Sequence, residues 1–171
     1  MSSIFSKYEE LIQKYHYLFP QEEDSQEPIT LFGFECKDGW YNILAGLFQT
    51  ITQDYRHHTR SLNYYTSKND SERIKEYTEL RDQALEKLPM FMQIKEKFGT
   101  LRIYYANGNK EIDRLTDFAE YMSEVTCEMC GNVGQTYTLG WHRTLCRDHA
   151  VSIYGENQVK FYEENSKDTQ N

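Results

Sequence analysis

Apolar residues recur every three or four positions in several stretches of the chain, which is the spacing of an amphipathic helix. The helices predicted on this basis span residues 4–19, 40–60, 72–88 and 110–125. Pro20 and Pro89 end the first and the third, because proline cannot continue a helix. Asp38 is suited to cap the start of the second. Between the second and the third we expect a polar linker at 63–71.

Apolar and polar residues alternate over 91–105, and alternation is the pattern of a β-strand. A break at residues 98–100 divides this stretch into two strands, and Gly99 allows the positive φ angle that a tight hairpin turn needs. A shorter strand is predicted at 31–36. We expect the apolar side chains of the hairpin to face the core: Met92, Ile94, Leu101 and Ile103.

Two short pairs of cysteine and histidine occur near the end of the sequence. Two residues separate Cys127 from Cys130, and two separate Cys146 from His149. Thiolate and imidazole are the ligands that Zn²⁺ prefers, and these pairs supply the four that a tetrahedral site requires. Because the four ligands leave no open position, the pattern predicts a structural zinc site rather than a catalytic one. Cys36 stands apart and is interpreted as a small buried residue on a strand.

The predicted zinc site is also expected to organise the local fold. A turn at 127–131, a hairpin within 133–145 and a helix from Cys146 follow one another in the order of a treble-clef finger, which this segment resembles. Gly155 is a point at which that helix can be interrupted.

These elements together predict an α+β fold, with helices packed on a small antiparallel sheet and a C-terminal treble-clef-like zinc module. The sheet would consist of the hairpin 91–105 and the strand 31–36. We expect a core domain at 1–125, a zinc-binding module at 126–164 packed on it, and a frayed tail at 165–171. A chain of 171 residues is long enough for one domain with a small satellite.

The charge and hydropathy of the chain exclude several classes of function. The net charge of −8 opposes non-specific binding along nucleic acid, which needs a positive field. There is no apolar run of the length that spans a bilayer, and the first residues lack the apolar core of a signal peptide. We therefore expect a cytoplasmic protein that contacts neither membrane nor nucleic acid.

Three motifs, in order along the chain, are similar to those of a family of small uncharacterised proteins of bacteriophages and prophages. They are FECKDGW at 34–40, QIKEKFGTLRIY at 93–104 and WHRTLCRDH at 141–149, with the Cys127-x-x-Cys130 pair before the last. The resemblance covers residues 31–150. It implies a phage-type origin and action in the cytoplasm of a bacterial host. Small accessory phage proteins bind a host protein or sequester a host defence signal, and this analogy suggests a counter-defence role.

The first functional hypothesis is a non-catalytic protein that binds a phosphate-containing, nucleotide-like ligand. Lysine and arginine would hold the phosphate, and tyrosine or tryptophan would stack on a ring. The candidate residues are Lys95, Lys97, Thr100, Arg102 and Tyr104 on the first hairpin, and Trp141, His142 and Arg143 on the second. The alternative is that these side chains form the solvated face of a sheet.

Two further functions remain open, and no catalytic residue is assigned. An acidic chain with 14 tyrosines suits an inhibitor that binds a host enzyme. A metal-dependent nuclease is the other, because His142 lies where some treble-clef domains hold a catalytic metal. That site would need further ligands, and Asn132 and Asp148 are the nearby candidates.

Overall fold

The computed structural model describes residues 7–20 and 34–166 and confirms the α+β fold. The helices are α1 (Lys7–Lys14), α2 (Tyr41–Ile51), α3 (Gln53–Ser67), α4 (Ser71–Glu86), α5 (Lys110–Glu124), α6 (Arg147–Tyr154) and α7 (Glu156–Ser166). The strands are β1 (Phe34–Glu35), β2 (Met90–Lys97), β3 (Thr100–Ala106), β4 (Gln135–Tyr137) and β5 (Arg143–Leu145). Two short 3-10 helices, η1 (His16–Leu18) and η3 (Asp38–Trp40), complete the described elements.

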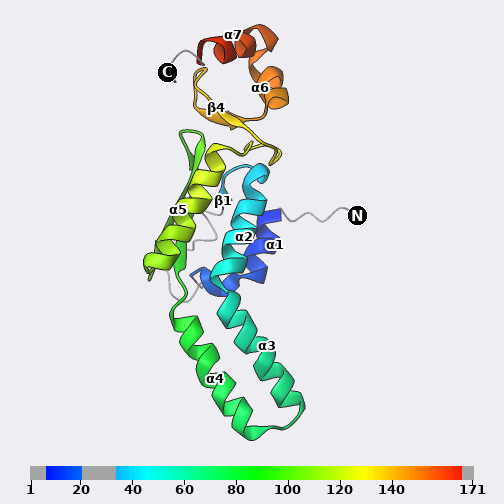
Figure 1. Cartoon of the computed structure of the whole chain (residues 1–171), viewed down its shortest axis with the longest axis vertical. Coiled ribbons are helices and arrows are strands. Elements are labelled where there is room, and N and C mark those ends of the chain that lie inside the picture. The colour runs from blue at the N-terminus through cyan, green and yellow to red at the C-terminus, as the bar shows by residue number, and fades with distance from the viewer. Residues whose placement is uncertain (1–6, 21–33, 167–171) are drawn as a thin grey trace.

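The molecule is elongated, and its parts follow one another along the long axis (Figure 1). The β4–β5 hairpin lies at one end with α6 and α7. The three-stranded sheet lies in the middle, together with α1, α2 and α5. The antiparallel pair α3 and α4 extends away at the other end, and none of its residues is buried.

An aromatic cluster forms the main core between α2, the N-terminal helix and the sheet. Phe48 of α2 is completely buried at its centre. Its ring centroid lies 5.8 Å from Tyr15, 5.7 Å from Phe19 and 4.9 Å from Phe91. Tilted and edge-on rings at these separations are favourable arrangements, so the high aromatic content of the chain is used mainly for packing.

The predicted hairpin is confirmed as β2 and β3, which pair antiparallel. Lys97 pairs with Thr100, so the turn contains only Phe98 and Gly99, whose φ angles are +55° and +80°. The strand predicted at 31–36 appears as β1, and its residues 31–33 lie outside the described part of the chain. β1 pairs with β2 in parallel, so the sheet is mixed rather than wholly antiparallel.

The prediction that Met92 faces the core is wrong. The strand register shifts between Phe91 and Gln93, which marks a β-bulge at Met92. The extra residue reverses the alternation of side chains, because successive residues of a strand point to opposite faces. Phe91 is therefore buried at 1% exposure, while Met92 is 42% exposed. Ile94, Leu101 and Ile103 are buried as predicted.

Helix α5 protects the free edge of the sheet. The backbone N–H of Leu101 donates to Ser123 Oγ at 2.8 Å, and that of Ile103 donates to Glu120 Oε1 at 2.8 Å. Edge strands carry a row of unpaired backbone groups that can recruit another chain, and α5 pairs two of these groups with its own side chains. Asn109 caps the helix, accepting from the backbone N–H groups of Glu111 and Ile112.

The helices before the sheet differ from their predicted bounds. The single helix expected at 40–60 is two helices that meet at Thr52, whose buried hydroxyl donates to Phe48 O at 2.7 Å. The linker expected at 63–71 is largely helical, since α3 continues to Ser67 and α4 begins after Asp70. The first helix ends at Lys14, and its predicted residues 4–6 lie outside the described part.

A close backbone contact joins the middle of the molecule to the β4–β5 end. The N–H of Gly39 donates to Glu128 O at 2.9 Å, and Trp40 Nε1 donates to Thr126 O at 2.8 Å. A Cβ atom at Gly39 would lie 2.1 Å from Cys127 O, so this approach requires glycine. A second hydrophobic cluster, around Tyr137 and Leu145, lies beyond this contact. The boundary expected at residue 125 stays a prediction.

We predict opposite effects of two glycine-to-alanine substitutions. Gly39→Ala should destabilise the protein by about 3 kcal/mol or more, because the methyl group overlaps the backbone of the neighbouring segment. Gly46→Ala lies in the interior of α2, with no atom within 4 Å of the new methyl group, and should stabilise it by about 0.5–1 kcal/mol. Denaturant unfolding of both variants measures the difference, and equal stabilities would contradict the Gly39 contact.

Candidate metal centre

The four residues predicted as metal ligands lie together and could hold a metal ion. The ligand atoms of Cys127, Cys130, Cys146 and His149 are all within 4.8 Å of one another. Cys127 Sγ is 3.5 Å from His149 Nδ1, Cys146 Sγ is 3.2 Å from the same nitrogen, and Cys130 Sγ is 3.8 Å from Cys146 Sγ. Cys127 is fully buried and Cys130 is exposed, so the cluster lies at the surface of the β4–β5 end.

Local backbone structure brings the two pairs together. The turn that carries the first pair is closed by hydrogen bonds from Gly131 N–H to Cys127 O at 2.9 Å and from Cys127 N–H to Asn132 O at 2.7 Å. Gly131 has a φ of +80°, a conformation that favours glycine. Cys146 is the N-cap of α6, which places His149 in the first turn of that helix. The predicted order of turn, hairpin and helix is thus observed, and Gly155 separates α6 from α7.

The thiols influence one another's ionisation. Burial acts to raise the pKa of the Cys127 thiol, but N–H groups of Cys146, Cys130 and Met129 outweigh burial and lower that pKa to about 7. At Cys130 the N–H of Asn132 favours the thiolate, whereas burial and the adjacent thiols oppose it, and the pKa rises to about 11. A bound cation would relieve this mutual opposition, because it stabilises all the thiolates at once.

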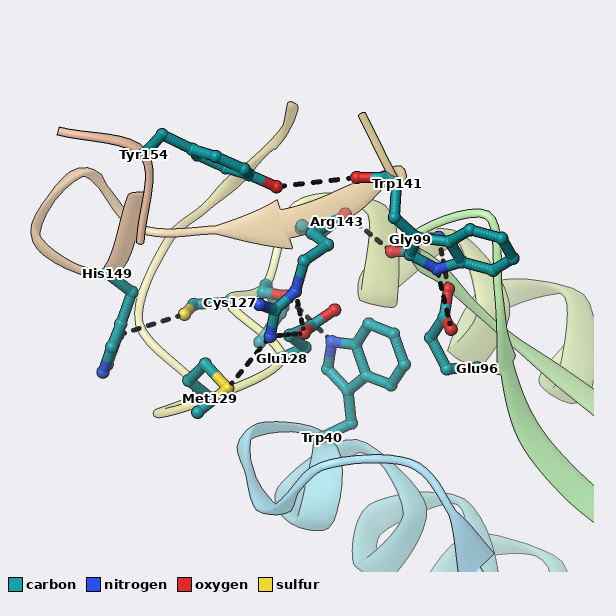
Figure 2. Close-up of polar contacts among 12 residues, drawn as sticks. Trp40, Glu96, Gly99, Cys127, Glu128, Met129, Trp141, Arg143, His149 and Tyr154 are labelled. Carbon is teal, nitrogen blue, oxygen red and sulfur yellow. Dashed lines mark hydrogen bonds and ion pairs between the residues drawn. The ribbon is translucent and has the colours of Figure 1, made fainter. Parts of the chain in front are cut away.

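A buried ion pair supports the turn between Cys127 and Cys130. Glu128 is 4% exposed, and its Oε1 accepts from Arg143 Nε at 2.8 Å and also from Arg143 Nη2. Arg143 Nη2 also donates to Met129 Sδ at 3.4 Å, as Figure 2 shows. The positive charge of Arg143, a predicted ligand-binding residue, is therefore directed at Glu128. Loss of Arg143 would leave the buried charge of Glu128 without a partner, which is strongly destabilising.

The two hairpins meet tip to tip beside this ion pair. Thr144 Oγ1 donates to Gly99 O at 2.7 Å, which joins β5 to the turn of the β2–β3 hairpin. Glu96 accepts from Gly99 N–H at 2.7 Å and from Trp141 Nε1 at 3.4 Å (Figure 2). A Cβ atom at Gly99 would lie 3.2 Å from Arg143 N, which shows how closely the backbones approach.

The predicted binding residues of the first hairpin share one face of the sheet. Lys95 pairs with Arg102, Lys97 pairs with Thr100, and Tyr104 follows on the same face. Lys95 Nζ lies 5.2 Å from the centre of the Tyr104 ring.

Two of these residues already have partners within the fold. Arg102 Nη1 donates to Thr100 Oγ1 at 2.7 Å and to Leu101 O at 2.6 Å, and it lies 3.5 Å from Glu120 Oε2. Thr100 is buried, with 8% exposure. Lys95, Lys97 and Tyr104 are the members of this face that remain available to a ligand.

Trp141 and His142 lie at the turn of the first hairpin, beside a residue that sequence reasoning missed. The ring of Phe98 is 6.3 Å from Trp141, nearly parallel at 27°, and 6.1 Å from His142. Phe98 is 55% exposed and Trp141 65%. One feature of the sequence could have identified Phe98 as unusual. It occupies a turn position at which asparagine, aspartate or glycine is usual.

A pocket of about 680 Å³ opens between β1 and the two hairpin tips. Its lining residues are Phe34, Glu35, Cys36, Lys37, Glu96, Glu128, Trp141 and Arg143. Three carboxylates outnumber two cations there, so the pocket itself does not favour an anion. Burial raises the pKa of the Cys36 thiol to about 11, which keeps that cysteine protonated and unreactive at neutral pH.

Comparisons with family models, curated proteins and solved structures give no match to this chain. Within residues 7–20 and 34–166, no helix combines the length and the apolar character needed to cross a bilayer.

We predict that Cys127→Ser abolishes metal retention and loosens the β4–β5 end. Serine does not replace a thiolate ligand, and the turn would lose its link to α6. Elemental analysis would show loss of the bound ion, and hydrogen exchange would show faster exchange over residues 127–165. The control is Cys36→Ser, which lies outside the cluster and should retain the metal. Full metal retention by Cys127→Ser would contradict the assignment.

Proposed function

We propose that this protein is a non-catalytic, zinc-stabilised binding protein, in which the metal holds two hairpin tips together as a ligand surface. The ligand set supports zinc. With Zn–S of about 2.3 Å and Zn–N of about 2.0–2.1 Å, neighbouring ligands of a regular tetrahedron lie about 3.6–3.8 Å apart. The separations of 3.5 Å and 3.8 Å agree with these values, and that of 3.2 Å is somewhat shorter.

A structural role for zinc follows from the same donor set. Three cysteines and one histidine provide all four ligands, so no position remains for a reactive water. In the described residues, no second group of histidine, cysteine, aspartate or glutamate could hold a catalytic metal near His142. This observation weighs against the nuclease alternative, since a metal nuclease needs such a group.

The proposed ligand is phosphate-containing and nucleotide-like, and a single observation carries this proposal. Lys95 and Lys97 lie two residues apart on one face, beside the aromatic rings of Tyr104 and Phe98. Among the described residues neither lysine forms an ion pair, so both ammonium groups are available to an anion. Their local positive charge contrasts with the overall charge of −8, which suits a small anion better than a long polyanion.

The resemblance of three motifs to those of phage proteins supports a role in the cytoplasm of a bacterial host. A protein that sequesters a nucleotide-like host signal there would act against a host defence, and it would need no catalytic residue.

Inhibition of a host protein is the second candidate, and an apolar groove between α2 and α5 favours it. The groove has a volume of about 480 Å³ and is lined by residues that include Leu47, Leu115 and Phe118. Phe118 is 62% exposed, and exposed aromatic side chains are common in protein interfaces. Co-purification of one host protein in stoichiometric amount, lost in Phe118→Asp and retained in Lys95→Gln/Lys97→Gln, would support this candidate.

Zinc binding predicts a specific response to cobalt and to pH. Replacement by Co²⁺ should produce the visible absorption of a tetrahedral thiolate complex, at one ion per chain. Metal affinity should fall as pH decreases, because protons compete with the ion for its thiolate ligands. An octahedral cobalt spectrum would contradict the proposed site.

We predict that charge removal at the two lysines weakens phosphate binding. The variant Lys95→Gln/Lys97→Gln should bind inorganic triphosphate at least about tenfold less tightly, since a hydrogen bond to a charged group contributes roughly 1.5–3 kcal/mol. Isothermal titration calorimetry measures the change. The matched control is Lys75→Gln, an exposed lysine of α4 far from the hairpin tips. Equal affinities of the two variants for triphosphate would refute the proposed surface.

A further inference from the structure

The turn that joins β2 to β3 contains a residue in an unfavourable conformation. Phe98 has a φ of +55°, in the left-handed region where a side chain with a Cβ atom is strained. Two-residue turns with positive φ at both positions favour asparagine or glycine, and here phenylalanine comes first. Burial does not offset this strain, because 55% of Phe98 is exposed. Strained residues of this kind concentrate at functional sites.

The ring of Phe98 faces a second exposed ring across the junction of the hairpins. The centroids of Phe98 and Trp141 are 6.3 Å apart, and their planes are inclined by only 27°. A planar ring inserted between them needs about 3.4 Å on each face, or roughly 7 Å in total, which is the stacking distance of nucleic acid bases. A centroid separation of 6.3 Å is that of an ordinary aromatic pair, so the two rings must move apart to admit a third.

One carboxylate and one hydroxyl hold this pair of rings in place. Glu96 accepts from Trp141 Nε1 and from the N–H of Gly99, which follows Phe98 in the chain (Figure 2). On the other side of the loop, Tyr154 Oη donates to Trp141 O at 3.5 Å. Trp141 and the turn that carries Phe98 are thus positioned by residues of two elements, Glu96 of β2 and Tyr154 of α6.

Cationic groups lie next to the same pair. Lys97 Nζ is 5.5 Å from the centre of the Phe98 ring. Lys95 is two residues earlier on the same face, a distance of about 7 Å along the strand. A nucleotide whose ring stacks on Phe98 would therefore have Lys97 next to it for its phosphates, with Lys95 following along the strand.

We propose that Phe98 and Trp141 form an aromatic clamp for the base of a nucleotide whose phosphates bind Lys97 and Lys95. This inference rests on the proposed function and adds the base as a second recognised group. A free nucleotide fits the surface better than a nucleic acid strand, because the net charge of −8 repels a polyanion beyond the local lysines. Stacking on aromatic side chains tolerates different bases, so the clamp selects a nucleotide rather than one particular base.

Tryptophan fluorescence provides a direct test. The chain contains two tryptophans, and Trp40 is fully buried with its Nε1 bonded to Thr126 O. A ligand that stacks at the hairpin tips should therefore quench Trp141 alone. We expect ATP to quench this signal and to bind at least about tenfold more tightly than inorganic triphosphate, which has similar charge but no ring.

The variant Phe98→Asn separates a binding role from a structural one. Asparagine is favoured at this turn position, so the variant should have a higher melting temperature than the wild type. It should also lose most of the advantage of ATP over triphosphate. The matched control is Phe161→Asn, since Phe161 is 68% exposed on α7, and it should bind ATP normally.

Three results would overturn the inference in different ways. Equal affinity for ATP and triphosphate, unchanged by Phe98→Asn, would refute the clamp and leave the proposed phosphate surface intact. Failure of both ligands to bind would refute the proposed function and the clamp together. Tighter binding of a short single-stranded oligodeoxynucleotide than of ATP would refute the assignment of a free nucleotide.

Discussion

The crowding of three thiols and one imidazole within 4.8 Å is the constraint on which the β4–β5 end depends. Without a cation the thiolates oppose one another, as the raised pKa of Cys130 shows. With a cation they bind the turn at 127–131 to the first residues of α6. A single bound ion would thus join two segments that are otherwise held by only a small hydrophobic cluster.

The metal-ligand cluster is linked to the middle of the molecule by short polar contacts. The turn that holds Cys127 also accepts the N–H of Gly39, and Glu128 within it pairs with Arg143 at the start of β5. The next residue of β5, Thr144, is bonded to Gly99 at the tip of the other hairpin. Each link is a specific polar contact. A metal bound at the cluster would therefore order the exposed aromatic surface without taking part in any chemistry there.

In this arrangement, the residues that stabilise the fold are distinct from those that we propose bind a ligand. Charged residues beside the metal-ligand cluster compensate one another, and Glu128 with Arg143 is the clearest case, since the charge of Arg143 serves Glu128 rather than a ligand. The aromatic side chains at the hairpin tips are instead exposed. Phe98 adopts a conformation that lowers stability, and Trp141 leaves most of its surface in water. Strained residues such as Phe98 concentrate at functional sites.

Local features of the sequence predicted much of this structure. The C-x2-C and C-x2-H pairs, the hairpin around Gly99, and the cap and apolar face of α5 all depend on residues close together in the chain. Their chemistry acts over a few residues, so spacing alone reveals them.

Contacts between distant segments decided the rest. The bulge that exposes Met92, the parallel pairing of β1 and the break at Thr52 depend on how the core packs, which periodicity does not record. The sequence alone showed two basic residues, Arg143 and Lys97, on predicted hairpins. Only the tertiary structure showed that one is held by Glu128 and the other is available beside Phe98, because a charge acquires its role from the groups that the fold places around it.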